Sequence, residues 1–575
     1  MIKHTLLFVL GILGAFAAVA QNPLRIPDTL SGPVMDLELQ SGTNVFYPGF
    51  ATGTLGANGP FMAPTLMLRR NRPVQLRVQN NLNDTTTIHW HGLHVPASAD
   101  GGPHSYIPSG TLWAPSFTVL DWAGTYWYHP HHHLHTNAQV SKGLTGFIVV
   151  RDSLEDALTL PRRYGVDDIP LLLQTKGFNA QKEITYDHPM DTAVMANGTL
   201  RAVHTLPAQV VRLRLLNGCS ERVLRLGFHN NESFWQIASD GGLLSAPVSL
   251  NRIQLGPGER ADILVNLSNR VGQSLQLKSF GSELPNAVYG ATQPGMGPGQ
   301  VIQGYSSNPL NGNDFTFVTF SVGAIQAPAV QTIPSTLVNH QPWSATMADT
   351  TRVLTFMPQN MGPTAIQGPF MINNAHFDMN VINQYVPVGR TEIWELVNQT
   401  PIAHPFHIHH NSFYILSVNN QPPSPSLAGR KDVVMVPGGM GRVRFIMKFE
   451  NFYDDVVPYM YHCHMLTHED HGMMGQFIVQ SPRVSSAEEG IPALGPSLLI
   501  GPQPATTHLK VQIKNGRGPA TLRVYSLTGA LLKSVPVEAS VVDLDIADLD
   551  PSIYLIEWKG SGKVYRTKFL KQSGF

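Results

Sequence analysis

Short segments in which hydrophobic and polar residues alternate recur along most of the chain, the pattern of β-strands that bury one face. Three of them share one form: residues 74–80, 211–217 and 392–398 alternate apolar and polar side chains and end at asparagine, which is suited to turns. Each is followed downstream by another alternating segment, at 116–119, 260–266 and 442–449. The copies are spaced as whole domains, so the sequence predicts three related β-sandwiches, at about 30–155, 160–325 and 330–480.

The composition changes after Gln480. Residues 481–507 are rich in Pro, Gly, Ser and Ala, which is typical of a linker. Residues 508–575 return to short alternating segments, and we expect a separate small β-sandwich there. The predicted fold class is therefore all-β, with three large sandwiches, a linker and a fourth, smaller sandwich.

The composition supports this fold and excludes some functions. The 51 glycines and 44 prolines favour many turns and short strands over long helices. Charged residues make up 14% of the chain, well below the roughly 25% of average soluble proteins. The formal net charge is zero and no Lys/Arg-rich run occurs, so nothing indicates nucleic-acid binding.

The first twenty residues have the form of a secretory signal peptide. Lys3 and His4 precede an apolar run over residues 6–17, and Ala18-Val19-Ala20 forms a small-residue cleavage site. A membrane anchor is the alternative, but the apolar run is short for a span, and no later segment is apolar enough to cross a bilayer. We therefore expect an exported protein, located in the periplasm, at the cell surface or in the medium.

The most informative chemistry stands in residues 461–468, Tyr-His-Cys-His-Met-Leu-Thr-His, which Met473 follows closely. Cysteine, histidine and a weak axial methionine are the ligands of a blue-copper electron-transfer site. Side chains alternate along a strand, so His462 and His464 point to one face and Cys463 points to the other. One tripeptide can therefore contact two metal centres on opposite sides of a strand.

Three further His-x-His pairs each place two imidazoles on one face of a strand: His89 and His91, His129 and His131, and His407 and His409. A single pair would more often be a partly exposed couple without a metal. Four pairs beside a Cys-His-Met loop favour copper. His404 stands an odd number of residues before His407 and can join Cys463 on the other face. Cys219 then has no partner, so we expect no intrachain disulfide.

These motifs resemble the three-domain multicopper oxidases, a family that includes laccases, bilirubin oxidases and copper-efflux oxidases. The resemblance runs from about Pro33 to Gln480 and is strongest to the bacterial copper-efflux type. The segments that carry it are His91–Leu93, Asp100–Pro103, His129–His131 with His133, Gln139, Gly143 and Gly146, Leu215–Cys219, Ala238–Leu244 and His468–Asp470. The resemblance implies that each predicted sandwich is a cupredoxin-like domain with Greek-key connections.

The resemblance also implies four copper ions: one type 1, one type 2 and a pair of type 3 ions. The type 1 ion would be held by His404, Cys463, His468 and an axial Met473. For Met473 the alternative is an ordinary core methionine. The ligands of the other ions would be His89 and His407 for type 2, His91, His129 and His464 for one type 3 ion, and His131, His409 and His462 for the other.

Reduction of dioxygen to water consumes four electrons and four protons. The site at Cys463 would accept electrons singly, and its peptide bonds to His462 and His464 give electrons a short covalent route. Asp100 and Glu469 match the acidic residues that relay protons in the copper-efflux type. For each of them the alternative is a turn or surface carboxylate.

We therefore expect an oxidase that couples one-electron oxidation of phenols or aromatic amines to reduction of dioxygen. The chain lacks the methionine-rich insertion of copper-efflux oxidases, which favours this laccase-like reaction over oxidation of cuprous or other metal ions, the alternative. A copper-binding protein or a copper-free scaffold of the same fold is the non-enzyme alternative, although no ligand is missing. Dioxygen and a small reductant are the expected partners of a monomeric protein.

The last segment resembles the C-terminal sorting domains of proteins that leave the cell by type IX secretion. The resemblance rests on Val524–Gly529, Asp548-Leu549, Tyr554–Ile556 and Lys568–Lys571, while Ile553 replaces the usual glycine. It implies the secretion machinery as a further partner. A small accessory binding domain is the alternative.

Overall fold

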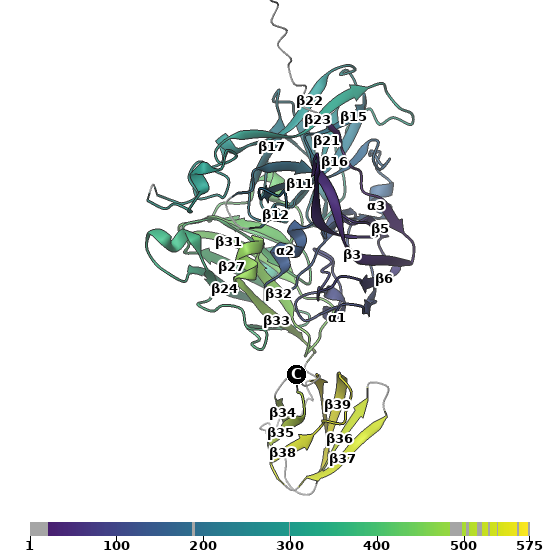
Figure 1. Cartoon of the computed structure of the whole chain (residues 1–575), viewed down its shortest axis with the longest axis vertical. Helices are drawn as coiled ribbons and strands as arrows, with labels where there is room; N and C mark the ends of the chain where they lie inside the picture. The colour runs from purple at the N-terminus through teal and green to yellow at the C-terminus, as the bar shows by residue number, and fades with distance from the viewer. Residues whose placement is uncertain are drawn as a thin grey trace, which may run out of the picture. The chain divides into compact units, whose positions relative to one another are not determined.

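The computed structural model describes residues 21–186, 190–297, 299–482, 497–501, 505–514, 520–526, 530–537, 539–560 and 563–572. The predicted signal peptide (1–20) and most of the predicted linker lie outside these residues. Strands dominate the described chain (Figure 1), which confirms the all-β class. The chain divides into two compact units, residues 1–482 and 483–575. In the described part, no helix combines the length and apolarity that crossing a membrane requires.

The first part of the large unit contains two sheets that enclose one core. One sheet has the order β2 (Thr29–Ser31), β5 (Thr65–Arg69), β10 (Gly146–Arg151), β9 (Gly124–Tyr128). The other has the order β4 (Phe50–Ala57), β3 (Val34–Tyr47), β6 (Pro73–Asn80), β7 (Leu112–Trp113), with β8 (Ser116–Thr118) also beside β6. Leu37, Leu76 and Ile148 from the two sheets meet in the core between them.

The middle part repeats this arrangement with more strands. One sheet has the order β1 (Asn22–Pro23), β15 (Ala202–Pro207), β23 (Asp314–Gly323), β22 (Ser274–Phe280), β17 (Leu224–Phe228), β20 (Ile253–Leu255). The other has the order β14 (Thr199–Leu200), β13 (Ala193–Ala196), β11 (Asp168–Phe178), β16 (Val210–Asn217), β21 (Arg260–Asn266), β18 (Phe234–Ser239), β19 (Gly242–Leu250), with β12 (Ile184–Thr185) beside β11. Leu213 and Val318 lie in its core.

The third part has two five-stranded sheets. One sheet has the order β25 (Phe370–Ile372), β24 (Thr350–Pro358), β27 (Thr391–Asn398), β31 (Gly441–Lys448), β29 (Phe413–Val418). The other has the order β26 (Gln384–Pro387), β33 (Met474–Gln480), β32 (Tyr459–Cys463), β28 (His404–Ile408), β30 (Val433–Val436). Leu396, Phe406 and Phe445 share its core.

The helices of the large unit are short: α1 (Ala97–Asp100), α2 (Thr136–Ser141), α3 (Ser153–Asp156), α4 (Leu466–Asp470) and the 3-10 turns η1 (Gly281–Glu283), η2 (Tyr305–Ser307), η3 (Ala345–Met347), η4 (Pro363–Gln367) and η5 (Pro425–Leu427).

The three repeated strands predicted from the sequence correspond to β6, β16 and β27. The asparagine that ends each of them, Asn80, Asn217 or Asn398, is fully buried. In each copy the side-chain Oδ1 accepts the N–H two residues later, and Nδ2 donates to two carbonyls, one four or five residues on and one from a distant strand or loop. Only an amide offers both donor and acceptor in this space, which explains why asparagine recurs at this turn.

The small unit also contains two sheets around one core. One sheet has the order β34 (Ser497–Gly501), β35 (His508–Lys514), β38 (Val541–Asp545). The other has the order β37 (Leu531–Val537), β36 (Ala520–Ser526), β39 (Ser552–Gly560), β40 (Lys563–Lys571). The predicted linker needs a correction at its end, because residues 497–501 form strand β34. Leu498 and Ile500 of this strand pack against the core of the unit, and the strand pairs with β35.

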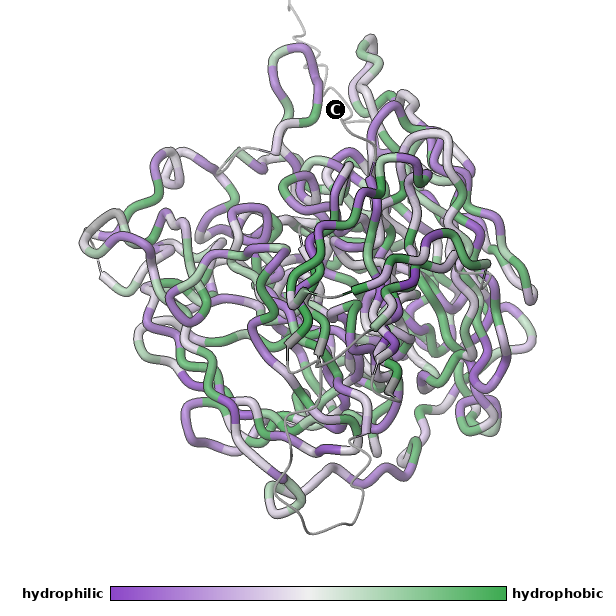
Figure 2. Tube along the Cα trace, turned by 90° about the horizontal axis from the view of Figure 1, so that it is seen from below, coloured by the Kyte–Doolittle hydropathy of each residue, from purple (hydrophilic) through white to green (hydrophobic). Residues whose placement is uncertain are grey.

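Hydrophobic and hydrophilic residues alternate over short distances along the trace (Figure 2). The alternation does not always mean that the polar side is exposed. Arg212 and Arg214 of β16 occupy the polar positions of the pattern, yet both are fully buried. They pair with Asp168 and Asp262, and Thr125 of β9 bonds to Arg214 and Asp262. The first sandwich thus covers this side of the middle one, and buried ion pairs replace the contact with water.

Asp121 leads to a prediction about the pH dependence of stability. Its Oδ1 accepts the N–H of His94, its Oδ2 is buried without a hydrogen-bond partner, and burial raises the pKa of its carboxyl to about 7. Between about pH 4 and pH 7 the folded protein then binds a proton that the unfolded chain has lost, so stability should fall as the pH rises through this window, by up to about 4 kcal/mol. Asp121→Asn should flatten this fall. Thermal melting at several pH values measures it, and parallel curves for the two proteins would contradict the assignment.

Candidate metal centre

The histidines of the four His-x-His pairs come together inside the large unit, although they are far apart in sequence. Backbone hydrogen bonds join His89 to His129, and His407 of β28 stands opposite His462 of β32 in an antiparallel pair. The eight side chains are buried, each with at most 2% of its surface exposed: His89, His91, His129, His131, His407, His409, His462 and His464. Strand pairing therefore converts the separate motifs into one buried cluster.

Within the cluster, three groups of histidines each have ligand atoms within 4.8 Å of one another. The groups are His89, His91 and His407; His91, His129 and His464; and His131, His409 and His462. The second and third groups contain the histidines that the resemblance assigns to the two type 3 ions, and the first adds His91 to the pair that it assigns to the type 2 ion. His89, His409 and Asp100 form a further group at its edge.

In six of the eight rings, a hydrogen bond to the outer nitrogen fixes which nitrogen faces the cluster. The Nδ1 atoms of His89, His129, His407 and His462 each lie 2.8–3.0 Å from a backbone carbonyl, so their Nε2 atoms point inward. His409 and His131 turn Nδ1 towards the carboxylates of Asp100 and Glu469. His91 is the exception: its Nε2 faces outward, 3.1 Å from Asp432 Oδ1, and its Nδ1 lies 3.2 Å from His464 Nε2 and 3.3 Å from His129 Nε2.

This arrangement fits a set of bound cations. The inward Nε2 atoms of His89, His407 and His409 are buried and have no hydrogen-bond partner. His131 Nε2 and His462 Nε2 face each other at 3.2 Å, while the Nδ1 of each ring lies 3.2 Å from an oxygen of Glu469. Two lone pairs would repel each other there, and burial holds the pKa of His131 well below its usual range. Neutral imidazoles with converging lone pairs are copper ligands.

A second candidate site lies on the other side of β32. Cys463 Sγ is 3.5 Å from His404 Nδ1 and 3.5 Å from His468 Nδ1. The Nε2 of His404 bonds to Thr400 Oγ1 at 2.7 Å, which turns Nδ1 towards the sulfur. Burial raises the pKa of the Cys463 thiol well above its usual value, so a thiolate in this position needs a cation beside it.

Met473, the predicted axial ligand, is fully buried in the same core as Cys463. Its N–H donates to the carbonyl of His468, and its carbonyl accepts the N–H of Cys463. Its backbone is therefore tied to two of the predicted ligands. Ligation by its sulfur stays a prediction.

The two predicted proton-relay acids both contact the histidine cluster. Asp100 Oδ2 lies 2.7 Å from His409 Nδ1, and burial raises the pKa of Asp100 to about 6. Glu469, 1% exposed, places its two oxygens 3.2 Å from His131 Nδ1 and 3.2 Å from His462 Nδ1. Asp100 also ends α1, and a Cβ on the next residue, Gly101, would meet the carbonyl of Ile88. The turn role and the site role of Asp100 therefore coexist.

The other histidines in or near the motifs belong to none of the metal-binding groups found among the described residues: His94, His104, His132, His133, His135, His410 and His471. His104, for example, bonds to Gln476, and His94 packs against His410. Sequence reasoning missed Thr400 and Asp432, which bond to His404 and His91. Nothing in the motifs marks these two residues: Thr400 lies outside the motif, four residues before His404, and Asp432 is far from His91 in sequence.

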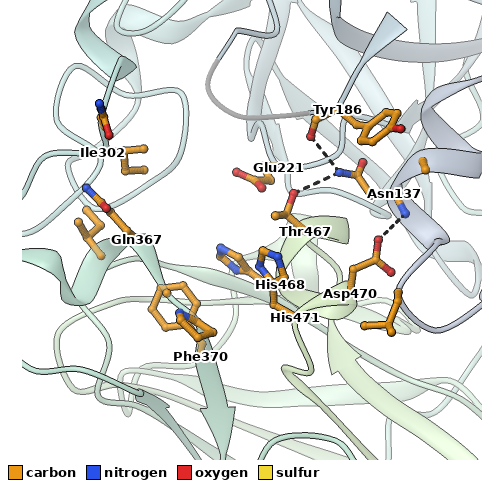
Figure 3. A pocket seen from close by; sticks show the side chains of 16 residues that line it. Asn137, Tyr186, Glu221, Ile302, Gln367, Phe370, Thr467, His468, Asp470 and His471 are labelled. Carbon is orange, nitrogen blue, oxygen red and sulfur yellow. Dashed lines mark hydrogen bonds between the residues drawn. The ribbon is translucent and has the colours of Figure 1, made fainter.

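A cavity of about 620 Å³ opens beside His468 (Figure 3). His468 is only partly buried, unlike the eight histidines of the cluster. The cavity is lined by aromatic and aliphatic side chains, amides and two acids, among them Tyr186, Phe370, Ile302, Ile366, Asn137, Gln367, Glu221 and Asp470. Asp470 accepts the N–H groups of Thr136 and Asn137, which ties α4 of the third sandwich to α2 of the first at the cavity wall.

Comparison with known proteins shows the family of the chain. Residues 39–155 and 341–483 match models of the multicopper oxidases, and residues 500–572 match the secretion system C-terminal sorting domain. The chain is 32% identical to the multicopper oxidase mco of Staphylococcus aureus over 454 residues, which cover 77% of this chain and 88% of that protein. It is also 28% identical over 475 residues to the cell division protein FtsP of Escherichia coli, covering 81% of this chain and 94% of that protein.

Solved structures give the same result. A laccase-like multicopper oxidase, CueO from the lignin-degrading bacterium Ochrobactrum sp., superposes with a TM-score of 0.69 at 30% identity over 80% of this chain and all of that one. McoA of the hyperthermophile Aquifex aeolicus gives a TM-score of 0.70 at 29% identity over the same shares. These neighbours confirm the predicted cupredoxin-like sandwiches, and the family confirms copper as the metal and an oxidoreductase as the activity. The chain belongs to the multicopper oxidases and ends in a secretion system C-terminal sorting domain.

Proposed function

We propose that this protein is a laccase-like oxidase that removes single electrons from small phenols or aromatic amines and reduces dioxygen to water. The proposal rests on one observation, that β32 and the residue after it contribute side chains to both sites. Cys463 lies in the cysteine site, and His462 and His464 lie in the histidine cluster. The bound copper ions would accept electrons singly at one site and deliver them to dioxygen at the other.

The ligands proposed for four copper ions are those that the family resemblance implies, and the grouping of the histidine and cysteine side chains supports them. Cys463, His404 and His468, whose ligand atoms lie within 4.8 Å of one another, would hold the type 1 ion, with Met473 as the axial ligand that the resemblance implies. The type 2 ion would be held by His89 and His407, one type 3 ion by His91, His129 and His464, and the other by His131, His409 and His462. A copper-free scaffold of this fold would have no use for buried imidazoles whose lone pairs converge.

The cavity beside His468 supports a small aromatic reductant. Its volume lies within the range of small-molecule sites, about 300–1,000 Å³. Tyr186, which is exposed, offers a face for an aromatic ring, and Glu221 and Asp470 offer acceptors for a phenol or an amine. Among the described residues that line it there is no methionine or cysteine, the side chains that bind cuprous ions.

A panel of reductants tests this choice. Copper-loaded protein should consume oxygen fastest with phenols or aromatic amines, and more slowly with Cu(I) or Fe(II). Gln367→Trp should fill part of the cavity and raise KM for the aromatic reductants, whereas Val271→Trp, on an exposed surface of the middle sandwich, should not. Faster oxidation of Cu(I), unaffected by Gln367→Trp, would favour the metal-ion oxidase instead.

The relay role of the acids leads to a further prediction. Asp100→Asn keeps an acceptor for His409 Nδ1 but cannot shuttle a proton, so reoxidation of the reduced enzyme by oxygen should slow by on the order of 10²-fold. Anaerobic bleaching of the blue colour by substrate should remain nearly unchanged. Stopped-flow absorbance separates the two half-reactions. Asp121→Asn, which changes another buried carboxylate, is the control, and equal slowing of both half-reactions in Asp100→Asn would argue against a relay.

A further inference from the structure

We propose that Asp432, held by Arg260 of the middle sandwich, is the positioning residue that fixes His91 and His407 and makes His91 bind copper through Nδ1. The inference rests on the proposed copper cluster and explains its one exceptional ring. It also gives the middle sandwich, which has no His-x-His pair, a part in the metal centre.

Asp432 contacts two histidines that belong to different copper ions in the proposed assignment. It immediately precedes β30 and is 1% exposed. Its Oδ1 lies 3.1 Å from His91 Nε2, and its backbone carbonyl lies 2.8 Å from His407 Nδ1. One short segment of the third sandwich thus orients a ring on the first sandwich and a ring on β28.

Arg260 holds the carboxylate of Asp432 in place. Its two terminal nitrogens lie 2.6 Å from Oδ1 and 2.6 Å from Oδ2, a bidentate pair. The remaining N–H groups donate to the carbonyls of Thr125, Gly258 and Asp240. All five donors of the guanidinium are therefore satisfied in a buried position, and a lysine ammonium with three donors cannot reproduce this arrangement.

The consequence for His91 follows from the tautomer. A carboxylate beside Nε2 accepts a hydrogen bond from Nε2–H and therefore favours the tautomer whose proton is on Nε2. The lone pair is then on Nδ1, the atom that faces His129 and His464. Without a fixed acceptor, the His91 ring can turn Nε2 inward as the neighbouring rings do. The atom available to bind copper then changes from Nδ1 to Nε2. The backbone is built for this contact: Gly92 has φ 87°, and a Cβ there would lie 2.4 Å from Asp432 Oδ2.

A purely structural ion pair would behave differently from a positioning pair. Arg214 and Asp168 provide the matched control, since this pair is also buried and bidentate, with distances of 2.6 and 2.9 Å. Among the described residues, the side-chain hydrogen bonds and ion pairs of Arg214 and Asp168 join them to Thr125, Asp262 and Arg151 and to each other, and to no histidine of the cluster. Arg214→Lys should lower the melting temperature without changing copper binding.

The experiment compares copper binding in the wild-type protein, Arg260→Lys, Asp432→Asn and Arg214→Lys. Copper per chain is measured by mass spectrometry at set free copper concentrations, and the site signatures by absorbance and electron paramagnetic resonance. In Arg260→Lys and Asp432→Asn, we expect the blue Cys463 site to fill normally, and copper affinity of the histidine cluster to fall about 10–100-fold with an altered resonance spectrum. Arg214→Lys should keep the wild-type affinity and spectrum.

Unchanged cluster affinity and spectra in both variants, with a wild-type protein that binds four copper ions, would overturn the inference alone. If Arg260→Lys does not fold, Asp432→Asn decides, because it keeps the shape of the side chain while it removes the charge and one of the two acceptor oxygens. A wild-type protein that binds no copper in the cluster would overturn the proposed function, and this inference with it.

Discussion

Replacing Cys463 with serine should abolish both the blue colour and the oxidase activity of the copper-loaded protein. The sulfur lies between His404 and His468, and thiolate-to-copper charge transfer is the source of the colour. A serine hydroxyl fills nearly the same space but is a poor ligand for copper at this position. The fold should be spared, because Cys463 is one small side chain in a large apolar core.

Cys219→Ser is the control for this change. Cys219 is the other cysteine of the chain, buried and without a disulfide, and its sulfur contacts Thr175 and the carbonyl of Leu173. The Cys219→Ser variant should keep the colour, the activity and the copper content, whereas the Cys463→Ser variant should lose one copper per chain. Absorbance, oxygen uptake and thermal melting measure the three properties. Full turnover in Cys463→Ser would show that electrons enter elsewhere.

Removing the C-terminal unit should leave the enzyme active but prevent its export from the periplasm. The large unit, residues 1–482, contains every predicted copper ligand and closes its own cores. A chain that ends at Pro482 should therefore fold, bind copper and oxidise substrates with little loss of stability. The matched sorting domain is the segment that the secretion machinery would read.

Fractionation of cells that produce the full and shortened chains measures this effect. The full chain should appear at the cell surface or in the medium, and the shortened chain should accumulate in the periplasm. As a control, residues 483–575 fused to an unrelated periplasmic protein should direct that protein outside. Equal amounts of both chains outside the cell would support an accessory domain instead.

The local parts of the copper site could be predicted from the sequence, because alternation along a strand sets which side chains share a face. The placement of Cys463 opposite His462 and His464 followed from this period alone. Strands β6, β16 and β27 were predicted within one residue, because apolar alternation and the final asparagine mark them.

The parts built from distant segments could not be predicted. Arg260 and Asp432 lie in different sandwiches, and each has the appearance of an ordinary polar residue in its own segment. The alternation in β16 shows that Arg212 and Arg214 share the polar face of the strand, but it does not show that another sandwich covers that face. The cavity beside His468 likewise combines segments near residues 137, 221, 302, 367 and 470, whose meeting depends on the packing of three sandwiches.

The ratio of electrons to oxygen tests the central claim most directly. Purified, copper-loaded protein is given a known amount of a one-electron aromatic reductant, while an oxygen electrode records oxygen consumption and a peroxide assay is run in parallel. If the site at Cys463 and the histidine cluster act together, four equivalents of reductant are consumed per dioxygen and no peroxide is released. Two equivalents per dioxygen, with peroxide in matching amount, would contradict the account.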